Sequence, residues 1–363
     1  MDNQLDNLTI AVIGCGSISR FHFAALEKLG VAVRWVCDLN EAAARPYAEK
    51  FGARYTADYH DVLADPQVNG RSQTIVVFVL TISSTHKVMC SDAIRAGKAV
   101  VCEKTLATNP ADALEIVRLA QERGTIFYTS YMKRFIPAVA KAKELLPALG
   151  TIFSTYIRTY QPWGDIWDAN PPEGFFHTPP GGASPVIRNY GGGILVCGGS
   201  HLLDLVGFFL GRPTKLYAKM YQPADRDYDL LASALIETPN GVVHYEAAAH
   251  PLKKIGFLRD GWDERIEING TRGRLEIYSA LWDDPSHKAS LLLHYDKETD
   301  VVHEYRYEAV SPFERAVAFY LQNIAAGRQG SQPITTGYDV DELIAHVKQS
   351  AASGKALNVK WRI

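Results

Sequence analysis

The chain has 363 residues, of which 47% are hydrophobic and 21% charged, and its formal net charge is −2. This length favours at least two domains, and the near-neutral charge gives no general attraction to nucleic acid or to an anionic membrane, so we exclude both as partners. The N-terminal sequence shows no signal-peptide pattern, and the longest apolar run, at residues 75–80, is far too short to span a bilayer. Five cysteines without metal-ligand spacing favour reduced thiols in the cytoplasm and predict no metal site.

Strand and helix patterns alternate through the first third of the chain. Apolar strands are predicted at residues 8–13, 31–37, 74–80, 99–103 and 125–129, with helical patterns at residues 18–29, 40–51, 61–64, 86–96 and 110–123. Strands that are apolar throughout and alternate with helices are typical of a parallel sheet covered on both faces. We therefore predict an α/β domain over residues 1–129.

A glycine-rich loop follows the first strand. Gly14, Gly16 and Ser19 form a G-x-G-x-x-S arrangement before a helix, and Asp38 closes the second strand. The first glycine permits a tight turn, the second lets a pyrophosphate approach the backbone at the helix N-terminus, and an acid about 20 residues later binds a ribose diol. Because that acid repels a 2′-phosphate and no Arg follows it, we predict a Rossmann domain that binds NAD rather than NADP. Other residues of the loop predicted to contact NAD are Ser17 and Ile18.

The pattern changes after residue 130. A helix at residues 138–149 and a strand at 151–160 precede a Pro/Gly-rich aromatic loop at 161–190, and a helix then runs to Leu210. Several strand patterns follow one another without intervening helices, and two helices close the chain. Consecutive strands imply a mostly antiparallel sheet. We predict that residues 130–363 form a second, α+β C-terminal domain.

Five motifs link the chain to a known family. The motifs "GCGSIS", "CDLN", "TISSTH", "CEKTLA" and "GGGILVCGGSHLLDL" resemble, in order and spacing, those of the Gfo/Idh/MocA (glucose-fructose oxidoreductase/inositol dehydrogenase) family of NAD(P)-dependent oxidoreductases. The resemblance covers essentially the whole chain. It implies that the second domain has a large open sheet that binds substrate on one side. The outer face of that sheet commonly makes the oligomer contact, so we expect a homodimer or homotetramer.

Glu103 and Lys104 lie at the end of an apolar strand, the edge at which open α/β sheets bind ligands. Alone, a lysine in this position would be interpreted as a surface residue. The family has Glu-Lys-Pro here, with a lysine that contacts substrate and cofactor, so the resemblance makes Lys104 a catalytic candidate and Glu103 a cofactor-binding one. Thr105 stands in place of the proline.

A second segment resembles the family's T-P-N-x-x-H pattern beside the nicotinamide. Thr81 and His86 match that pattern, whereas Ile82 and Ser83 do not. The residues predicted to contact the cofactor in this segment are Thr81, Ser83 and His86.

The glycine-rich stretch from Gly191 to His201 resembles a helix that carries D-x-G-x-H in relatives. Gly199 and His201 match, and Cys197 replaces the aspartate. The resemblance implies that His201 is the general base, a role that suits a side chain with a pKa near neutrality; without it, a core histidine is the better interpretation. A neutral thiol cannot supply the orienting charge of a carboxylate. Glycines inside a helix predict close approach by a ligand or by backbone.

The remaining candidates follow from position. The segment SYMKRF, residues 130–135, resembles a family segment at the domain junction, and the loop at residues 161–190 is rich in aromatic rings. Such rings suit the apolar faces of sugars, and a surplus of cations favours an anionic sugar, although each residue singly is more often structural. The predicted substrate-binding residues are Lys133, Arg134, Arg158, Trp163, His177, Tyr190 and Cys197, with Tyr131 as a further catalytic candidate.

Three functions fit these residues. The first is an NAD-dependent oxidoreductase acting on a secondary CH–OH of a sugar or cyclic polyol, with Lys104 or His201 taking the hydroxyl proton. The second is an NAD-dependent glycoside hydrolase, as some relatives are, which oxidises the sugar transiently, eliminates the aglycone, adds water and reduces again while NAD stays bound. The absence of an aspartate at position 197 and the long aromatic loop are the reasons to keep the glycoside hydrolase as an alternative. The third is a non-catalytic NAD-binding sensor, against which Lys104 and His201 argue.

Overall fold

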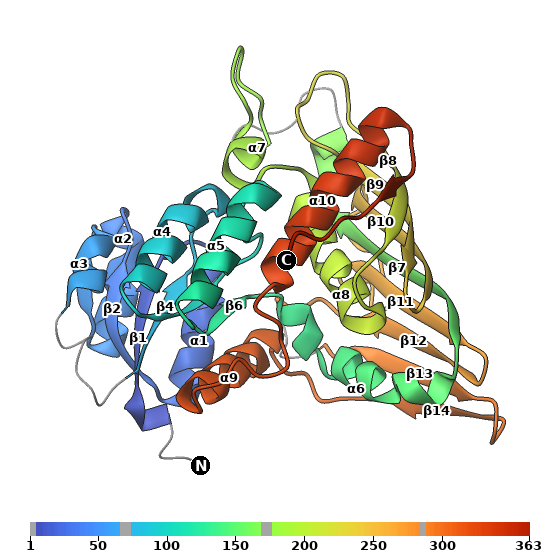
Figure 1. Ribbon diagram of the computed structural model, residues 1–363, viewed down its shortest axis with the longest axis horizontal. Helices are drawn as coiled ribbons and strands as arrows, with labels where there is room; N and C mark the ends of the chain where they lie inside the picture. The colour runs from blue at the N-terminus through green and yellow to red at the C-terminus, as the bar shows by residue number, and fades with distance from the viewer. Residues whose placement is uncertain (1–4, 66–73, 168–175, 284–287) are drawn as a thin grey trace. The chain divides into compact units, whose positions relative to one another are not determined.

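The computed structural model describes residues 5–65, 74–167, 176–283 and 288–363 (Figure 1). The chain divides into two compact units, the first formed by Met1–Tyr131, Phe313–Tyr338 and Ile363, and the second by Met132–Pro312 and Asp339–Arg362. The expected boundary between residues 129 and 130 lies close to the first break. The segment Phe313–Tyr338, which we expected in the second domain, groups with the first unit, because Phe313 stacks on Phe21 with a centroid distance of 5.1 Å.

The first unit contains a six-stranded parallel sheet with the order β3-β2-β1-β4-β5-β6. Its strands are β1 (Leu8–Ile13), β2 (Ala32–Cys37), β3 (Arg54–Thr56), β4 (Thr74–Val79), β5 (Ala99–Cys102) and β6 (Phe127–Thr129). Its helices are α1 (Ser19–Leu29), α2 (Glu41–Phe51), α3 (Tyr59–Ala64), α4 (Ser83–Arg95), α5 (Pro110–Glu122) and α9 (Pro312–Ala325). All six residues of β1 are buried, as expected for a central strand between two helical layers. This strand order confirms the predicted Rossmann fold.

The second unit is built on a nine-stranded sheet with the order β14-β13-β12-β11-β7-β10-β9-β8-β15. Its strands are β7 (Ile152–Pro162), β8 (Lys215–Tyr221), β9 (Leu231–Thr238), β10 (Gly241–His250), β11 (Asp263–Gly270), β12 (Gly273–Ser279), β13 (Leu291–Asp296), β14 (Val301–Tyr305) and β15 (Leu357–Asn358). Strands β7 and β10 pair in parallel, and the other neighbours for which a register is given pair antiparallel. The large, mostly antiparallel sheet is therefore confirmed.

Helices cover one face of this sheet (Figure 1). They are α6 (Pro137–Leu145), α8 (Ser200–Leu210) and α10 (Thr336–Ser353), with the short helix α7 (Pro185–Tyr190) nearby in sequence to α8. Helix α6 contacts β12 and β13, and α8 contacts β7 and β10. The region that we expected to be a continuous loop contains α7, which begins in the usual way, with Ser184 accepting a hydrogen bond from the N–H of Ile187 and with Pro185 in the first turn.

Strand β7 shows how the sheet separates its two faces. Thr155, Ile157, Thr159 and Gln161 are buried and point to the helical side, whereas the alternating residues, such as Tyr156, point to the outer face. Among the described residues no helix packs on that outer face (Figure 1).

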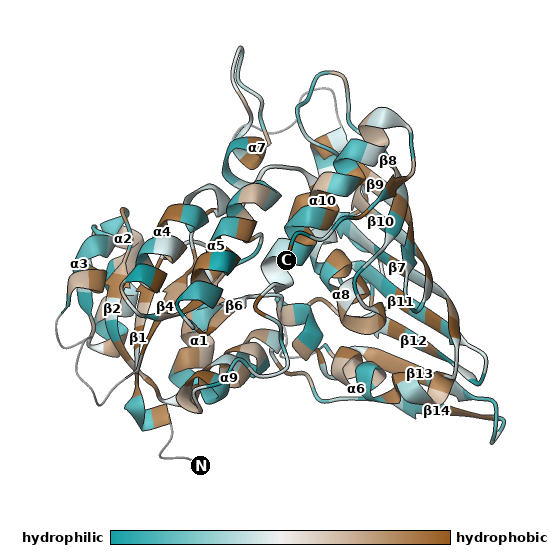
Figure 2. Cartoon of the chain, viewed as in Figure 1, coloured by the Kyte–Doolittle hydropathy of each residue, from teal (hydrophilic) through white to brown (hydrophobic). Residues whose placement is uncertain are grey.

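One helical stretch, Pro185–Leu210, is long and apolar enough to cross a membrane by length and composition alone. Its apolar window is 83% buried inside the structure, and Figure 2 shows α8 as largely hydrophobic next to the sheet. A helix that is apolar on most sides and enclosed by protein is typical of the core of a globular unit.

Candidate active site

The glycine loop of the first unit has the shape of a phosphate site. Gly14 has φ of +102°, and a Cβ on it would lie 2.7 Å from the carbonyl of Leu80, so only glycine fits there. A Cβ on Gly16 would meet no described atom within 4 Å, so the space beside it is open. No side chain caps the start of α1, which leaves its N-terminal dipole for an anion. These residues fit the pyrophosphate of a dinucleotide.

Asp38 is held at the end of β2 by two backbone groups. Its Oδ2 accepts a hydrogen bond from the N–H of Cys15 at 2.6 Å, and its Oδ1 accepts one from the N–H of Asn40 at 2.7 Å. Burial and, secondly, the charge of Asp38 raise the pKa of the Cys15 thiol to about 12, and the same two causes raise the pKa of Cys37 to about 12. Both cysteines therefore stay protonated thiols and are poor nucleophiles, whereas Asp38 presents a fixed negative charge beside the glycine loop.

Lys104 follows β5 and is half-buried, and its peptide bond to Thr105 is cis. Two of the residues that depart from the family pattern contact each other, because the Thr105 hydroxyl donates a hydrogen bond to Ser83 Oγ at 3.2 Å. Ser83 is 2% exposed, so this hydrogen bond is buried and fixes Thr105 next to Lys104. Thr105 in place of proline thus goes together with Ser83 in place of asparagine.

His86, predicted to contact the cofactor, is fully buried. Its Nδ1 lies 2.9 Å from the carbonyl oxygen of Thr105, and its Nε2 lies 3.1 Å from that of Thr81. Burial lowers the pKa of His86, against the opposing effect of these carbonyl contacts, so the ring is neutral. His86 therefore links the loop after β4, which contains Thr81, to the loop after β5, which contains Thr105.

Glu103 is also enclosed, with 4% of the residue exposed. Its Oε1 lies 2.7 Å from Nε2 of His22, and its Oε2 accepts a hydrogen bond from the N–H of Lys104 at 3.1 Å. We predicted a cofactor contact for this carboxylate, but these contacts direct it into the interior of the first unit.

In the second unit, the glycine-rich stretch leads into a π-helix, Leu195–Gly199, which continues as α8. A single carboxylate caps its start: Asp229 accepts hydrogen bonds from the N–H of Gly193 at 2.8 Å and from the N–H of Leu195 at 2.7 Å. A Cβ on Gly193 would lie 2.1 Å from the carbonyl oxygen of Asp229, so this approach requires glycine. Lys348 donates a hydrogen bond to the carbonyl oxygen of Gly191. Burial raises the pKa of Asp229, although the two N–H groups oppose that shift.

The glycines inside the helix admit protein side chains. A Cβ on Gly198 would lie 2.3 Å from Nε2 of Gln161, and a Cβ on Gly199 would lie 2.1 Å from the hydroxyl oxygen of Tyr245. Other atoms therefore do approach these glycines closely, as predicted. We had expected a ligand or backbone in this position, but the atoms are those of side chains of β7 and β10. The π-helix widens the helical turn at this point, a feature that often accompanies functional sites.

His201 follows the π-helix in the first turn of α8 and is 6% exposed. Cys197 is half-buried, and its Sγ lies 3.9 Å from the carbonyl oxygen of Gly192. Histidine and cysteine are thus placed on one continuous helical segment, with the sheet on one side and the capped glycines at its start.

Three predicted substrate cations have carboxylate partners instead. Lys133 is 1% exposed, forms a buried ion pair with Glu264 and lies over the ring of Trp262. Arg134 binds Asp204 through two nitrogens, with Nε 2.8 Å from Oδ2, and burial raises the pKa of Asp204 although Arg134 opposes that shift. Arg158 has the opposite orientation on β7 from Gln161, so it lies on the outer face, where it pairs with Asp263 at 2.8 Å. Buried pairing and strand alternation therefore remove these cations from the group expected to meet substrate.

The aromatic loop is only partly described. Trp163 is half-buried, donates a hydrogen bond from Nε1 to Gln161 Oε1 at 3.3 Å and packs against Phe176 with a centroid distance of 4.7 Å. His177 is exposed and Tyr190 is half-buried. Tyr131 is fully buried, which argues against the direct acid–base role predicted for it. Trp163 and Gln161 therefore form the best-defined polar and aromatic surface next to the π-helix Leu195–Gly199.

Sequence reasoning missed Gln161, Tyr245 and Asp229. The alternation along β7 was a usable signal for Gln161, because Thr155, Ile157 and Thr159 share its orientation. Nothing in the local sequence marks Asp229 as the cap of a helix that begins more than thirty residues earlier.

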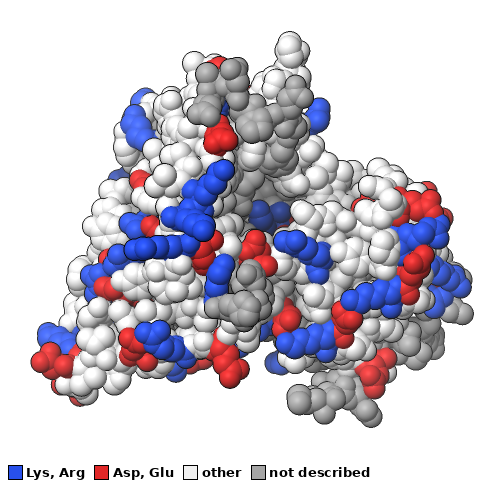
Figure 3. Space-filling view, turned by 180° about the vertical axis from the view of Figure 1, so that it is seen from behind, with Lys and Arg blue, Asp and Glu red and all other residues white. Residues whose placement is uncertain are grey.

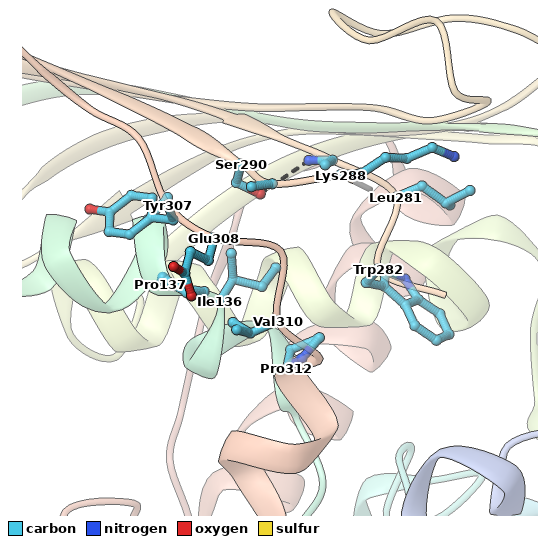
Figure 4. Close-up of a pocket in the computed structure, with 13 residues that line it drawn as sticks. Ile136, Pro137, Leu281, Trp282, Lys288, Ser290, Tyr307, Glu308, Val310 and Pro312 are labelled. Carbon is cyan, nitrogen blue, oxygen red and sulfur yellow. Dashed lines mark hydrogen bonds between the residues drawn. The ribbon is translucent and has the colours of Figure 1, made fainter. Parts of the chain in front are cut away.

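One cavity of the second unit is shown in Figure 4. It lies between the start of α6, the segment after β12 and the residues that precede α9, and Ile136, Trp282, Ser290 and Tyr307 line it. Its volume is about 20 Å³, which is room for roughly one water molecule and not for a sugar. This cavity is therefore not the substrate site.

Comparison with known proteins agrees with this geometry. Residues 8–131 match the family described as "Oxidoreductase family, NAD-binding Rossmann fold", and residues 139–276 match the "GFO/IDH/MocA C-terminal domain". The chain is 24% identical to a myo-inositol 2-dehydrogenase of Thermotoga maritima over 349 residues, which cover 91% of this chain and 94% of that protein. It is 25% identical to the scyllo-inositol 2-dehydrogenase (NAD(+)) of Bacillus subtilis over 340 residues, or 91% and 89% of the two chains.

A solved structure shows the same fold. Levoglucosan dehydrogenase in complex with NADH and levoglucosan has a TM-score of 0.81 and 20% identity, and the match covers 98% of this chain and 100% of that one. Since the two family matches together span most of the sequence, the protein is an oxidoreductase of the Gfo/Idh/MocA family with an NAD-binding Rossmann domain.

Proposed function

We propose that this protein is an NAD-dependent dehydrogenase that oxidises a secondary alcohol of a sugar or cyclic polyol. The observation that carries the proposal is the combination, in one chain, of the open glycine loop with Asp38, the Lys104 loop and the helix that carries His201. The inositol dehydrogenases named above support the substrate class.

The chemistry is divided between the cofactor and two side chains. NAD, when bound at the glycine loop, supplies the hydride acceptor. Asp38 holds the adenosine ribose and disfavours a 2′-phosphate, which is why we propose NAD rather than NADP. Lys104 donates a hydrogen bond to the substrate oxygen, and the imidazole of His201 takes the hydroxyl proton as hydride leaves. His201 suits this step because its first-turn position and limited exposure keep the ring ordered.

We infer that the preferred substrate is neutral. Lys133, Arg134 and Arg158 suggested an anionic sugar, but each is paired with a carboxylate. A panel of inositols, aldoses and uronates assayed by NADH absorbance tests this point. Faster turnover of a uronate than of every neutral polyol would contradict it.

The assignment of roles is tested with Lys104→Ala and His201→Ala. Each variant should lower kcat by about 100-fold or more, the typical contribution of a positioned acid or base, while NAD binding to the His201→Ala variant stays near that of the unaltered protein. Turnover near the original rate in either variant would show that the assignment is wrong.

A second candidate, the NAD-dependent glycosidase, is favoured by one observation. Cys197 stands where relatives have aspartate, so the proton-transfer machinery next to His201 differs. This reaction needs a further acid or base, for which Tyr131 and Tyr190 are the candidates. Because Tyr131 is fully buried and Tyr190 is half-buried, we propose Tyr190 for that role. Release of aglycone from aryl glycosides without net NADH formation would establish this activity in place of the dehydrogenase.

We also propose that the protein forms a homodimer or homotetramer through the outer face of the nine-stranded sheet. Exposed Tyr156, Tyr217 and Leu235 lie on that face, around a hollow of about 640 Å³. Acidic and basic side chains alternate there, as in the pairs Arg265–Glu267 and Arg158–Asp263, which suits a self-complementary contact. Light scattering of the unaltered protein and of Tyr156→Lys tests the proposal, and a monomeric unaltered protein would refute it.

On the side drawn in Figure 3, Lys and Arg side chains lie interspersed with Asp and Glu. This mixed distribution supports a small-molecule partner rather than nucleic acid or a membrane surface. We further propose a cytoplasmic location, which is supported by the five cysteines, because none of them forms a disulfide within the described part of the chain.

A further inference from the structure

We propose that His22 is a positioning residue for Lys104 and acts through Glu103. The proposal rests on the dehydrogenase function proposed above and adds to it a role for a buried pair in the interior of the first unit. It concerns residues of this unit alone, so it depends on contacts within one compact body.

The first observation is a buried hydrogen bond between distant segments. His22 Nε2, on α1, lies 2.7 Å from Glu103 Oε1, and the two side chains are 0% and 5% exposed. The other ring nitrogen of His22 has no hydrogen-bond partner among the described residues, so Glu103 is the polar contact that explains a histidine here. Burying two ionisable groups is unfavourable unless they are paired, and an apolar pair would pack with less cost.

The second observation is that Glu103 holds the backbone of the proposed catalytic lysine. Its second oxygen accepts a hydrogen bond from the N–H of Lys104 at 3.1 Å. The carboxylate of Glu103 therefore connects His22 of α1 with the backbone of Lys104. The ring of His22 is itself fixed, because it packs edge-on against Phe78 and Phe313 at centroid distances of 5.7 and 5.1 Å.

The third observation is the charge of this carboxylate. Burial opposes ionisation of Glu103, but the hydrogen bond and charge of His22 and the charge of Lys104 lower its pKa overall. The titratable groups that interact with it are His22 from α1, His86 from α4 and Lys104. The Glu103 carboxylate is therefore a negative charge that interacts with the charge of Lys104, and His22 holds this carboxylate by a hydrogen bond.

The experiment compares His22→Leu, His22→Gln, Glu103→Gln and the double variant His22→Leu/Glu103→Gln. His60→Leu is the matched control, because His60 also pairs with a carboxylate, Asp58, but both side chains are exposed. We expect His22→Leu to lower kcat by about 100-fold, the effect of a small misplacement of a reacting group, while the dissociation constant for NAD changes by less than about 3-fold. His22→Gln, which keeps a donor, should recover most of the activity, and His60→Leu should behave as the unaltered protein.

The double variant decides whether His22 acts through Glu103. If it does, His22→Leu should lower kcat by less than about 2-fold further in the Glu103→Gln background, because the two residues form one unit. Additive losses, or a parallel loss of kcat and NAD affinity in His22→Leu, would overturn the proposal. If His22→Leu does not fold, His22→Met takes its place in the same comparison, because methionine also has no hydrogen-bond donor and fills a similar volume.

A readout without turnover separates this inference from the proposed function. Lysines are labelled by reductive ¹³C-methylation, and the Lys104 signal is assigned by its loss in Lys104→Arg. His22→Leu and Glu103→Gln should each change the ¹³C chemical shift of that signal, because each removes part of the contact that holds the backbone N–H of Lys104. An unchanged chemical shift in His22→Leu refutes the inference. An unaltered protein that oxidises no polyol refutes the proposed function, and the chemical shifts then decide this inference by themselves.

Discussion

Gly199→Ala should destabilise the second unit, because the added methyl group has no room. Its Cβ would lie 2.1 Å from the Tyr245 hydroxyl oxygen and 2.9 Å from Cβ of Ala247, far inside van der Waals contact. Tyr245 is 1% exposed and cannot move away freely. Overpacking of this severity costs about 3 kcal/mol, and the better helix propensity of alanine returns about 1 kcal/mol. We expect a net loss of about 2 kcal/mol in the free energy of unfolding.

The second variant of the cycle is Tyr245→Phe. The Tyr245 hydroxyl is buried and has no hydrogen-bond partner among the described residues, so its removal should change stability by less than about 1 kcal/mol. Because the 2.9 Å approach to Cβ of Ala247 remains, the double variant should recover only part of the loss, with a coupling energy of about 1 kcal/mol. Urea denaturation followed by tryptophan fluorescence measures these differences.

Gly207→Ala is the matched control for this cycle. Gly207 lies in the same helix, but a Cβ there would meet no described atom within 4 Å, so alanine should stabilise the helix by up to about 1 kcal/mol. A Gly199→Ala protein as stable as the unaltered one would refute the steric argument. A loss of the same size in the presence of Tyr245→Phe would show that the hydroxyl is not the cause.

Three further predictions concern the two units separately. Asp38→Ala should weaken NAD binding by about 10-fold, or about 1.4 kcal/mol, and should leave NADP binding unchanged or stronger. Fluorescence titration measures both affinities, and equal losses of NAD and NADP affinity would contradict the role of Asp38. Because the pKa of Glu103 is lowered in the fold, its ionised form contributes stability that is complete above its unfolded value of about 4.3 and is lost as the pH falls through the folded value. The melting temperature of Glu103→Gln should therefore approach that of the unaltered protein as the pH falls below about 4.3, and a constant difference would count against this assignment. Arg158→Ala should keep KM for a polyol within about 2-fold, since its side chain lies on the outer sheet face and a direct substrate contact would contribute more.

Local patterns indicated those parts of the candidate site that depend on neighbouring residues. Gly14, Gly16 and Asp38 occupy a strand–turn–helix sequence whose geometry follows from backbone conformation, and Lys104 follows from the end of an apolar strand. The fold class followed in the same way, from alternating and consecutive strand patterns.

Side-chain partners across the sheet were not predictable in this way. Lys133 was predicted to bind substrate because of its charge and its position in the SYMKRF segment. Its partner in the structure is Glu264, which is 131 residues away in the sequence. Arg158 was accessible to better reasoning, because the alternation of buried residues along β7 already assigns it to the face opposite Gln161. Which of the predicted cations are paired with carboxylates therefore depends on the tertiary structure and could not be predicted from local sequence.

The cap at the start of the His201 helix also affects the order in which the chain can fold. The N–H groups of Gly193 and Leu195 find their acceptor in Asp229, which is 36 and 34 residues later in the chain. On the ribosome these groups leave the exit tunnel first and bind water until Asp229 follows. Tyr245 and Ala247, which fill the surface at Gly199, emerge later still. The cap and the packing of the helix that carries the proposed base can therefore be completed only after β10 has been made.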